Sequence, residues 1–212
     1  MENINIVCFG FGQVAKSFIK KLYSEKYSFN LVTTTRQNSC EKKFEKIKYK
    51  CFQLNGDIFD IKIIDEVKKA THILVSTPPE VEDNIIKNFS KYLENNKSLK
   101  WFGYLSSTSV YGNHDGRWVN EETFANPTLK KGKKRLKAEL KFNNLNIPLI
   151  IFRLSGIYSN ENNVFNRMKK NNMRIVEMEN QIFSRIHLED ISNILHLSLK
   201  IKKMIKGEIF NL

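Results

Sequence analysis

Two glycines near the N-terminus have the spacing that most directly suggests chemistry. A GxGxxA pattern, residues 10 to 15, directly follows an apolar run from Ile4 to Phe9. At a strand-to-helix junction the first glycine permits a tight turn, and the second lets the backbone approach a pyrophosphate. The pattern predicts that a dinucleotide binds at Gly10, Phe11, Gly12, Gln13 and Val14. A glycine turn that serves only packing is the alternative.

The end of the second apolar run discriminates between cofactors. A site selective for NAD places Asp or Glu there for the ribose 2′-OH, whereas an NADP site accepts Arg. Here three threonines are followed by Arg36, without a carboxylate. Because a guanidinium can form a fork on a 2′-phosphate, we expect NADP(H) as cofactor, with NAD also possible. The alternative for Arg36 is a plain solvent-facing cation.

Positions after the next two predicted strands complete the expected cofactor site. Asp57 could meet the adenine edge, although an Asn-Gly-Asp turn explains it equally well. Ser76, Thr77 and Pro78 lie where the fourth predicted strand ends, and we expect them to line the cofactor.

Strands and helices alternate along the chain in a way that would position these residues. Short apolar runs predict strands, and apolar residues at helical spacing predict helices. The Lys-rich stretch between 36 and 49 predicts a loop or a weak helix. Predicted strands are 4–9, 31–35, 50–54, 72–77, 101–107, 149–154, 173–178, 181–188 and 207–212. Predicted helices begin at 14 and cover 60–69, 84–95, 132–144, 164–171 and 190–199.

This alternation predicts an α/β fold: a Rossmann-type, doubly wound parallel sheet with helices on both faces. We expect residues 1–155 to form the NAD(P)-binding core. Residues 156–212 would supply a reduced C-terminal substrate lobe together with the last core helix and strand. Asp190 is placed to cap that last helix.

The composition is that of a globular protein, with 41% hydrophobic and 27% charged residues, and no apolar run approaches a membrane span. The net charge of +13 would attract anions such as phosphates. Lysines are scattered, however, and no helix-turn-helix or aromatic-interleaved signature accompanies them, so nucleic-acid binding is not favoured.

Three cysteines, Cys8, Cys40 and Cys51, form an odd and widely spaced set without a CxxC pair. This set argues against a disulfide framework and a zinc site, and no metal is expected. The N-terminus has no basic region before its apolar stretch, which argues against a secretory signal. We expect a cytoplasmic protein with reduced thiols.

Four motifs resemble the short-chain dehydrogenase/reductase superfamily, and especially its extended members, the sugar-nucleotide epimerases and dehydratases. They are SSTSVYG (106–112), GKKRLKAE (132–139), FRLSGIY (152–158) and SRIHLEDI (184–191). The resemblance implies that Ser107 is the catalytic hydroxyl, with a strand-end cap as the alternative. It also implies a substrate contact at Thr108.

The resemblance breaks at the family's Tyr-x-x-x-Lys motif, whose positions are held here by Lys131 and Arg135. The usual acid/base phenol is missing. Lys131 could act as a base only if its pKa fell by several units, and Arg135 could bind ribose hydroxyls without relaying a proton. Tyr111 is the nearby phenol that could replace the missing acid/base. The alternative is that Tyr111 has only a packing role. This pattern is similar to the atypical branch of the superfamily.

A second departure is that the chain stops at Leu212, so that we expect a reduced or truncated substrate lobe. The remaining polar candidates there include His114. Arg185 and His187 lie two apart on a predicted strand and share a face, which suits a substrate phosphate or carboxylate. A structural, hydrogen-bonded role is the alternative for His187.

The sequence therefore predicts an atypical, NADP(H)-binding, epimerase/dehydratase-like protein acting on a small sugar or nucleotide-linked substrate. In the extended family, the helices after strands four and five pair in a dimer interface, so a homodimer is possible. The rival hypothesis is a non-catalytic NADP(H)-binding redox sensor or partner protein.

Overall fold

The computed structural model describes residues 4–169, 182–201 and 207–212. The predicted strand 173–178 lies outside these residues, as do the end of the predicted helix 164–171 and residue 181 of the predicted strand 181–188.

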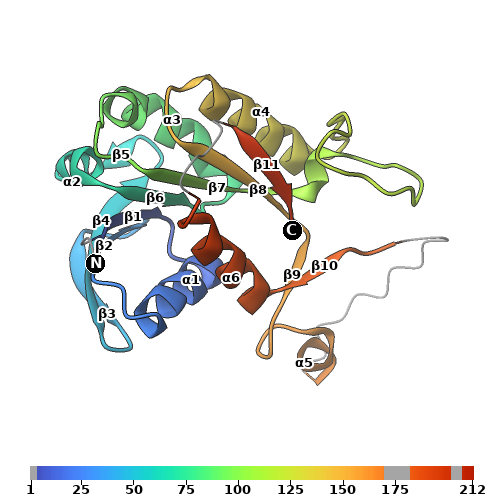
Figure 1. The fold of residues 1–212 in the computed structure, drawn as a ribbon, viewed down its shortest axis with the longest axis horizontal. Helices are drawn as coiled ribbons and strands as arrows, with labels where there is room; N and C mark the ends of the chain where they lie inside the picture. The colour runs from blue at the N-terminus through green and yellow to red at the C-terminus, as the bar shows by residue number, and fades with distance from the viewer. Residues whose placement is uncertain (1–3, 170–181, 202–206) are drawn as a thin grey trace.

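The core is a mostly parallel sheet with the order β11-β8-β7-β6-β1-β2-β4-β3 (Figure 1). The order reverses between β1 and β6, because β2 and β6 lie on opposite sides of β1. This arrangement confirms the predicted doubly wound fold. The parallel strands are β1 (Ile4–Phe9), β2 (Phe29–Thr35), β4 (Ile47–Asn55), β6 (His72–Val75), β7 (Trp101–Ser107), β8 (Leu149–Leu154) and β11 (Glu208–Asn211).

Helices cover both faces of the sheet, as the run of buried residues in its central strands requires. One face carries α2 (Ile63–Lys69), α3 (Pro79–Glu94) and α4 (Lys130–Asn144), whose Val67, Phe89 and Phe142 are fully buried. The other carries α1 (Gln13–Ser24) and α6 (Leu188–Ser198), which contribute Phe18 and Leu195. Figure 1 shows these two layers above and below the sheet.

Helix α3 begins five residues before the predicted start at 84. Pro78 is its N-cap residue and Pro79 occupies the first helical turn. Proline has no N–H to donate and a φ suited to a helix, so the Pro-Pro pair both ends β6 and starts α3. Helix α4 likewise begins at Lys130 rather than at 132.

The prediction of a loop or weak helix between 36 and 49 was wrong. Residues 40–44 form β3 (Cys40–Phe44), which pairs antiparallel with β4, and β5 (Ile58–Phe59) pairs antiparallel with β4 as well. The rings of Phe44 and Tyr49 pack against Phe11, at centroid distances of 5.6 and 5.0 Å. These tertiary contacts outweigh the weak strand propensity of a lysine-rich segment.

Outside the main sheet, β9 (Gly156–Tyr158) pairs in parallel with β10 (Arg185–His187), and α5 (Val164–Lys169) lies between them in the chain. A short 3-10 helix, η1 (Thr108–Val110), follows β7. Helix α6 begins directly after β10, and its N-cap is His187 without a side-chain cap. The predicted capping role of Asp190 was therefore wrong, although its charge in the first turn still suits the helix dipole.

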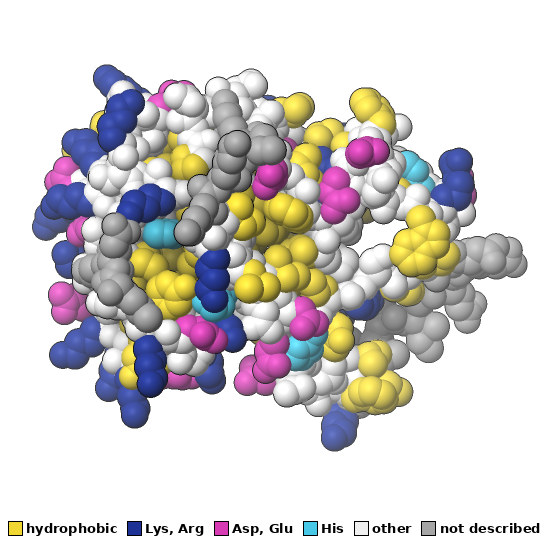
Figure 2. Space-filling view, in the orientation of Figure 1, with side chains coloured by type: hydrophobic (Ala, Val, Ile, Leu, Met, Phe, Trp, Pro, Cys, Tyr) yellow, Lys and Arg dark blue, Asp and Glu magenta, His cyan; other side chains and the backbone are white. Residues whose placement is uncertain are grey.

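Basic side chains are unevenly distributed over the face of the molecule shown in Figure 2. Figure 2 shows Lys and Arg mostly around the left of the view, on the side of the molecule that holds β2, β3 and β4. In the part of the chain that the structure describes, no helix has the length and apolar character needed to cross a membrane.

Candidate functional site

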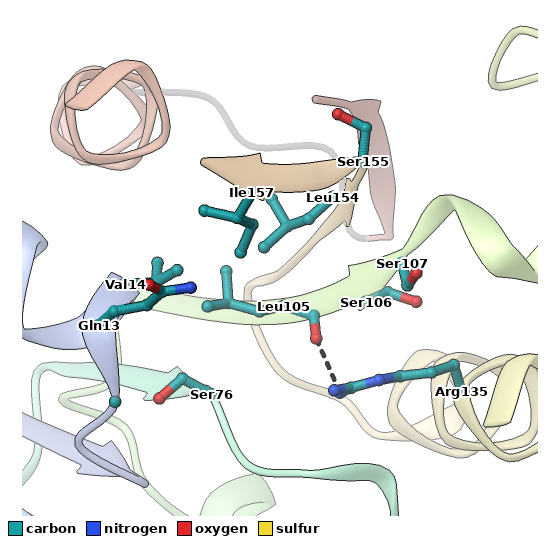
Figure 3. A pocket seen from close by; sticks show the side chains of 11 residues that line it. Gln13, Val14, Ser76, Leu105, Ser106, Ser107, Arg135, Leu154, Ser155 and Ile157 are labelled. Atoms are coloured by element: carbon teal, nitrogen blue, oxygen red, sulfur yellow. Dashed lines mark hydrogen bonds between the residues drawn. The ribbon is translucent and has the colours of Figure 1, made fainter. Parts of the chain in front are cut away.

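A cleft of about 320 Å³ lies where the strand order reverses, at the carboxyl ends of the central strands. Ligands of open α/β sheets bind at this place. Figure 3 shows side chains from α1, β7, α4 and the β8–β9 connection around the cleft. The lining residues are Gly12, Gln13, Val14, Ser76, Leu105, Ser106, Ser107, Arg135, Leu154, Ser155 and Ile157.

The N-terminus of α1 opens into this cleft. Its N-cap residue is Gly12, which provides no side-chain cap, and its first turn contains no acidic residue. The first-turn amides are therefore left without a side-chain acceptor, and the helix dipole favours an anion there. A Cβ atom at Gly12 would meet no atom within 4 Å. The open space beside this glycine fits a pyrophosphate.

The turn before α1 is held by contacts from two neighbouring strands. Gly10 has a φ of +84°, and a Cβ there would lie 3.0 Å from the Ser76 carbonyl oxygen. The Gly10 N–H donates to Thr34 Oγ1 at 2.8 Å, and Ser76 Oγ donates to the Gly10 carbonyl at 3.1 Å. These contacts explain the glycine at position 10. Phe11 packs instead on the β3–β4 hairpin.

The remaining predicted cofactor residues, Arg36, Asp57, Thr77 and Pro78, do not line the cleft. Arg36 is exposed and directly follows β2. Asp57 forms an ion pair with Lys87 of α3 at 3.0 Å. Pro78 caps α3, and the carbonyl oxygen of Thr77 accepts a hydrogen bond from Arg135 at 3.1 Å.

Arg135 reaches from α4 to the floor of the cleft, where it is held by three acceptors. Its Nη1 donates to the Leu105 carbonyl oxygen at 2.9 Å (Figure 3). The same Nη1 donates to Glu82 Oε1, and Nη2 donates to the Thr77 carbonyl oxygen. Three of the five N–H donors of the guanidinium are thus engaged by the protein. Arg135 therefore presents a fixed positive charge rather than a free fork.

Glu82, the ion-pair partner of Arg135, is almost completely buried at 1% exposure. Burial raises the pKa of Glu82 to about 7, against the opposing attraction of Arg135. Two buried polar atoms of this region, Glu82 Oε2 and Thr77 Oγ1, have no hydrogen-bond partner among the described residues, and the Tyr104 hydroxyl acts on both Glu82 and Arg135. The Arg135 guanidinium lies 5.9 Å from the Tyr104 ring centroid. The polar groups below the cleft are therefore incompletely satisfied.

A second buried network lies beside the first and is more fully bonded. Arg153 binds Glu139 through two hydrogen bonds of 3.1 and 2.7 Å. Its Nη1 donates to the Tyr111 hydroxyl at 2.9 Å, and that hydroxyl donates to Asn211 Oδ1 at 2.7 Å. Ser106 Oγ also donates to Glu139 Oε1. Tyr111, which is 2% exposed, is thus bonded away from the cleft, and this favours its packing alternative.

The remaining predicted catalytic residues lie in different settings. Ser107 lines the cleft, and its Oγ accepts the Ser109 N–H at 3.2 Å, so it caps η1 while its own O–H stays available. Thr108 Oγ1 points to the Leu154 carbonyl oxygen at 3.4 Å. Lys131 is exposed in the first turn of α4 and does not line the cleft.

The predicted substrate-lobe residues do not meet at the cleft. Arg185 is exposed, and its guanidinium lies 4.8 Å from the Phe183 ring centroid. The ring of His187 packs on Tyr158, with 5.0 Å between centroids. His114 Nε2 lies 3.2 Å from the Tyr111 carbonyl oxygen. Structural contacts therefore account for His114 and His187.

Sequence reasoning missed several residues of the site. Glu82 lies before the predicted helix start at 84, and nothing in its spacing marked it as buried. Ser155 and Ile157 line the cleft because the chain leaves β8 and enters the unpredicted strand β9. The described residues hold no group of three or more His, Cys, Asp and Glu side chains that could bind a metal ion.

Comparisons with known proteins were made by sequence and by structure. No family model and no curated protein matches the sequence. A functionally unknown conserved protein from Silicibacter pomeroyi is 28% identical in sequence, with a TM-score of 0.79 over 100% of this chain and 72% of that chain.

Two enzymes at lower identity share the fold. A mutant of UDP-glucuronic acid 4-epimerase from Bacillus cereus, in complex with a fluorinated UDP-glucuronic acid and NAD, is 15% identical with a TM-score of 0.75 over 99% of this chain and 77% of that chain. The enzyme WbmG from Bordetella bronchiseptica, in complex with NAD and UDP, is 13% identical with a TM-score of 0.74 over 100% and 73%. The chain therefore has the Rossmann-like fold of NAD-dependent epimerase/dehydratase-like enzymes.

Proposed function

We propose that the protein binds a nicotinamide dinucleotide, preferably NADP(H), in the cleft at the N-terminus of α1. The proposal makes the chain an atypical, epimerase/dehydratase-like member of the short-chain dehydrogenase/reductase superfamily. The observation that carries it is the uncapped start of α1, where Gly12 leaves open space at a positive helix end. The complexes of the two enzymes of similar fold with NAD support it.

The backbone around Gly10, Gly12 and Gln13 would hold the pyrophosphate, and Arg36 would meet the 2′-phosphate. When bound, the nicotinamide supplies reversible hydride exchange. Ser107 lines the cleft, its oxygen accepts the Ser109 N–H, and its own proton makes no hydrogen bond to the described residues, so it can be donated to a ligand. It would orient a carbonyl or hydroxyl of the substrate. Arg135 would add a fixed positive charge at the floor.

The substrate class proposed is a sugar or nucleotide-linked sugar. Its support is the fold shared with enzymes whose structures hold UDP or a UDP-sugar. The phenol of Tyr111 is bonded to Asn211 and Arg153, so Ser107 would act without a neighbouring acid/base phenol. We therefore expect turnover to be slow.

A second candidate function is a non-catalytic NADP(H)-binding sensor or partner protein. The observation in its favour is where Lys131 and Arg135, which hold the positions of the family's catalytic Tyr and Lys, lie and what they bind. Lys131 is exposed outside the cleft, and Arg135 is bound to Glu82 and two carbonyl oxygens. Neither residue can hand a proton to a ligand in the cleft from this arrangement.

Calorimetric titration with NADPH and NADH tests the binding proposal. We expect wild-type protein to prefer NADPH, Arg36→Ala to lose that preference by about tenfold, and Gly12→Val to bind neither nucleotide. Position 12 has a φ of −81°, which any residue adopts, so the valine fills the cleft without straining the fold. Lys131→Ala is the matched control and should bind like wild type. Failure of the wild-type protein to bind either nucleotide would overturn the proposal.

Turnover separates the two candidate functions. NADPH oxidation is followed with a panel of carbonyl compounds and UDP-sugars, in wild type and Ser107→Ala. Turnover that falls at least tenfold in Ser107→Ala supports the enzyme, whereas tight binding without turnover supports the sensor. Turnover that is unchanged by Ser107→Ala would remove the role given to this hydroxyl.

A further inference from the structure

The unpredicted β3–β4 hairpin brings two cysteines together. Cys40 and Cys51 are directly opposite each other in the antiparallel register of these strands. Directly opposed residues of an antiparallel pair have Cα atoms about 4.5 to 5.5 Å apart, and disulfides span Cα separations of about 4.4 to 6.8 Å. The register alone therefore places the pair within disulfide range.

The two thiols also point to the same side of the sheet. Directly opposed residues share a face, and here this is the face that carries Phe44 and Tyr49. Burial raises the pKa of the Tyr49 phenol, and the Cys51 and Cys40 thiols raise it further. Both sulfur atoms thus act on one phenol. Cys40 is exposed and Cys51 is 4% exposed, so that one thiol is open to a reagent and the other is sheltered.

The pair is close to the part of the site that would select the cofactor. Arg36 precedes Cys40 by four residues in the segment between β2 and β3. Ser39 in this segment accepts the Gln53 N–H at 2.9 Å and donates to Asp60 at 2.7 Å. The same hairpin supports Phe11 of the glycine turn. A bond across the hairpin would therefore restrain the Arg36 segment and the support of Phe11, which both lie where the adenosine part of the cofactor would bind.

We propose that Cys40 and Cys51 are a redox-active dithiol that closes to a disulfide across the β3–β4 hairpin. Closure ties the segment that carries Arg36 to β4 and tightens the binding of NADPH. The disulfide itself is independent of the proposed function, whereas its effect on NADPH rests on that function.

The oxidant for this step is a small disulfide such as oxidised glutathione. The Cys40 thiolate attacks one sulfur of the oxidant, the S–S bond of the oxidant breaks, and the first glutathione leaves as a thiolate. The Cys51 thiolate then attacks Cys40 Sγ in the mixed disulfide and expels the second glutathione. The two protons lost by the cysteines go to the two leaving thiolates. Two protein thiols are oxidised and one glutathione disulfide is reduced.

Cys8 is an internal control. It pairs in register with Thr33, and Thr33 pairs with Cys51, so Cys8 is two strands away from Cys51. Two strand spacings are about 9.6 Å, which exceeds the reach of a disulfide. Cys8 is fully buried, and burial raises the pKa of its thiol far above the usual range. It should remain reduced.

The test is oxidation of the full chain with a series of glutathione redox buffers, followed by intact mass and peptide mapping without reduction. Wild type and Cys8→Ala should each lose two hydrogen atoms and yield one peptide pair joining Cys40 to Cys51. Cys51→Ser should stop at a single glutathione adduct on Cys40, and Cys40→Ser should stay unmodified. A wild-type protein that keeps all its thiols, or stops at the adduct, would overturn the proposal.

NADPH and NADH titrations of the oxidised and reduced forms then test the coupling. We expect oxidised wild type to bind NADPH about threefold more tightly than reduced wild type, with a smaller change for NADH, because preorganising the Arg36 segment acts on the 2′-phosphate. A disulfide that leaves NADPH affinity unchanged would overturn the coupling. A disulfide without NADPH binding in either form would instead count against the proposed function.

Discussion

Helix α4 contributes to two Arg–Glu pairs, one buried and one partly buried, that differ in how completely they are bonded. Glu139 pairs with Arg153, and its two oxygens together accept three hydrogen bonds from Arg153 and Ser106. Arg135, one turn earlier, pairs with Glu82, whose second oxygen has no partner among the described residues. The bonded pair lies among Tyr111 and Asn211, whereas the incomplete pair borders the cleft.

The difference separates a structural ion pair from one that can respond to its surroundings. A buried pair is stabilising only when its remaining lone pairs and protons are satisfied. Both oxygens of Glu139 are bonded and Arg153 also donates to Tyr111, so this pair comes closer to the condition and fixes the end of β8 to α4. Glu82 has one oxygen without a hydrogen-bond partner among the described residues, and burial raises the pKa of its carboxyl group to about 7. The pair that borders the cleft is thus the less satisfied of the two.

The largest expected effect is the loss of the bonded pair. Glu139→Gln leaves the Arg153 charge, which is 4% exposed, without a carboxylate, and should lower the free energy of unfolding by about 3 to 5 kcal/mol. Urea unfolding followed by tryptophan fluorescence measures it. The exposed Glu122→Gln is the control and should stay within about 0.5 kcal/mol of wild type. Equal stabilities of the two variants would contradict the structural role of Glu139.

The next effect is a pH dependence of stability that comes from Glu82. The folded-state pKa of about 7 lies above the ordinary value of 4.5, so between these values the folded protein binds more protons than the unfolded chain. The free energy of unfolding should therefore fall, by about 3 kcal/mol, as the pH rises through this window. The groups that face this carboxyl are Arg135, Tyr104, Glu80 and Asp83.

Urea unfolding at about pH 5 and about pH 8 in wild type and Glu82→Gln checks this slope. The difference between the two proteins isolates Glu82 from all other titrating groups. Wild type should lose stability relative to the variant as the pH rises. Parallel pH profiles for the two proteins would show that the carboxyl titrates normally.

The smallest effect compares one hydroxyl from each region. Tyr111→Phe removes hydrogen bonds to Arg153 and Asn211 and should cost about 1 to 2 kcal/mol of unfolding free energy. Thr77→Val removes a buried hydroxyl that has no partner among the described residues and should change stability by less than about 0.5 kcal/mol. Thermal unfolding of both variants measures the contrast, and a larger loss in Thr77→Val would reverse it.

The fold could be predicted from the sequence where local patterns and tertiary structure agree. The buried strands β1, β6, β7 and β8 are near-continuous apolar runs, and Pro, Gly or polar residues end them. Strand β3, with the sequence CEKKF, has no such pattern. It forms because β4 offers an open edge and Phe11 offers a surface to Phe44.

The site could be predicted in part. The glycine turn and Ser107 could be predicted, because each belongs to a short motif of consecutive residues, and Gly12 and Ser107 do line the cleft. Glu82 and Arg135 could not be paired in advance, because 53 residues separate them and only the packing of α3 on α4 brings them together. The opposition of Cys40 and Cys51 was hidden for the same reason, because it depends on the register of an unpredicted hairpin.

Strand β3 also affects whether molecules of this protein associate through their sheet edges at high concentration. It is the last strand at its end of the sheet, and its outer backbone groups could in principle pair with a strand from another molecule. Lys42 and Lys43 lie along this short strand, and Lys43 is opposite Lys48. An approaching copy would bring the same positive charges to the same edge. The same lysines that make the segment look unlike a strand in the sequence thus oppose edge-to-edge aggregation by charge repulsion.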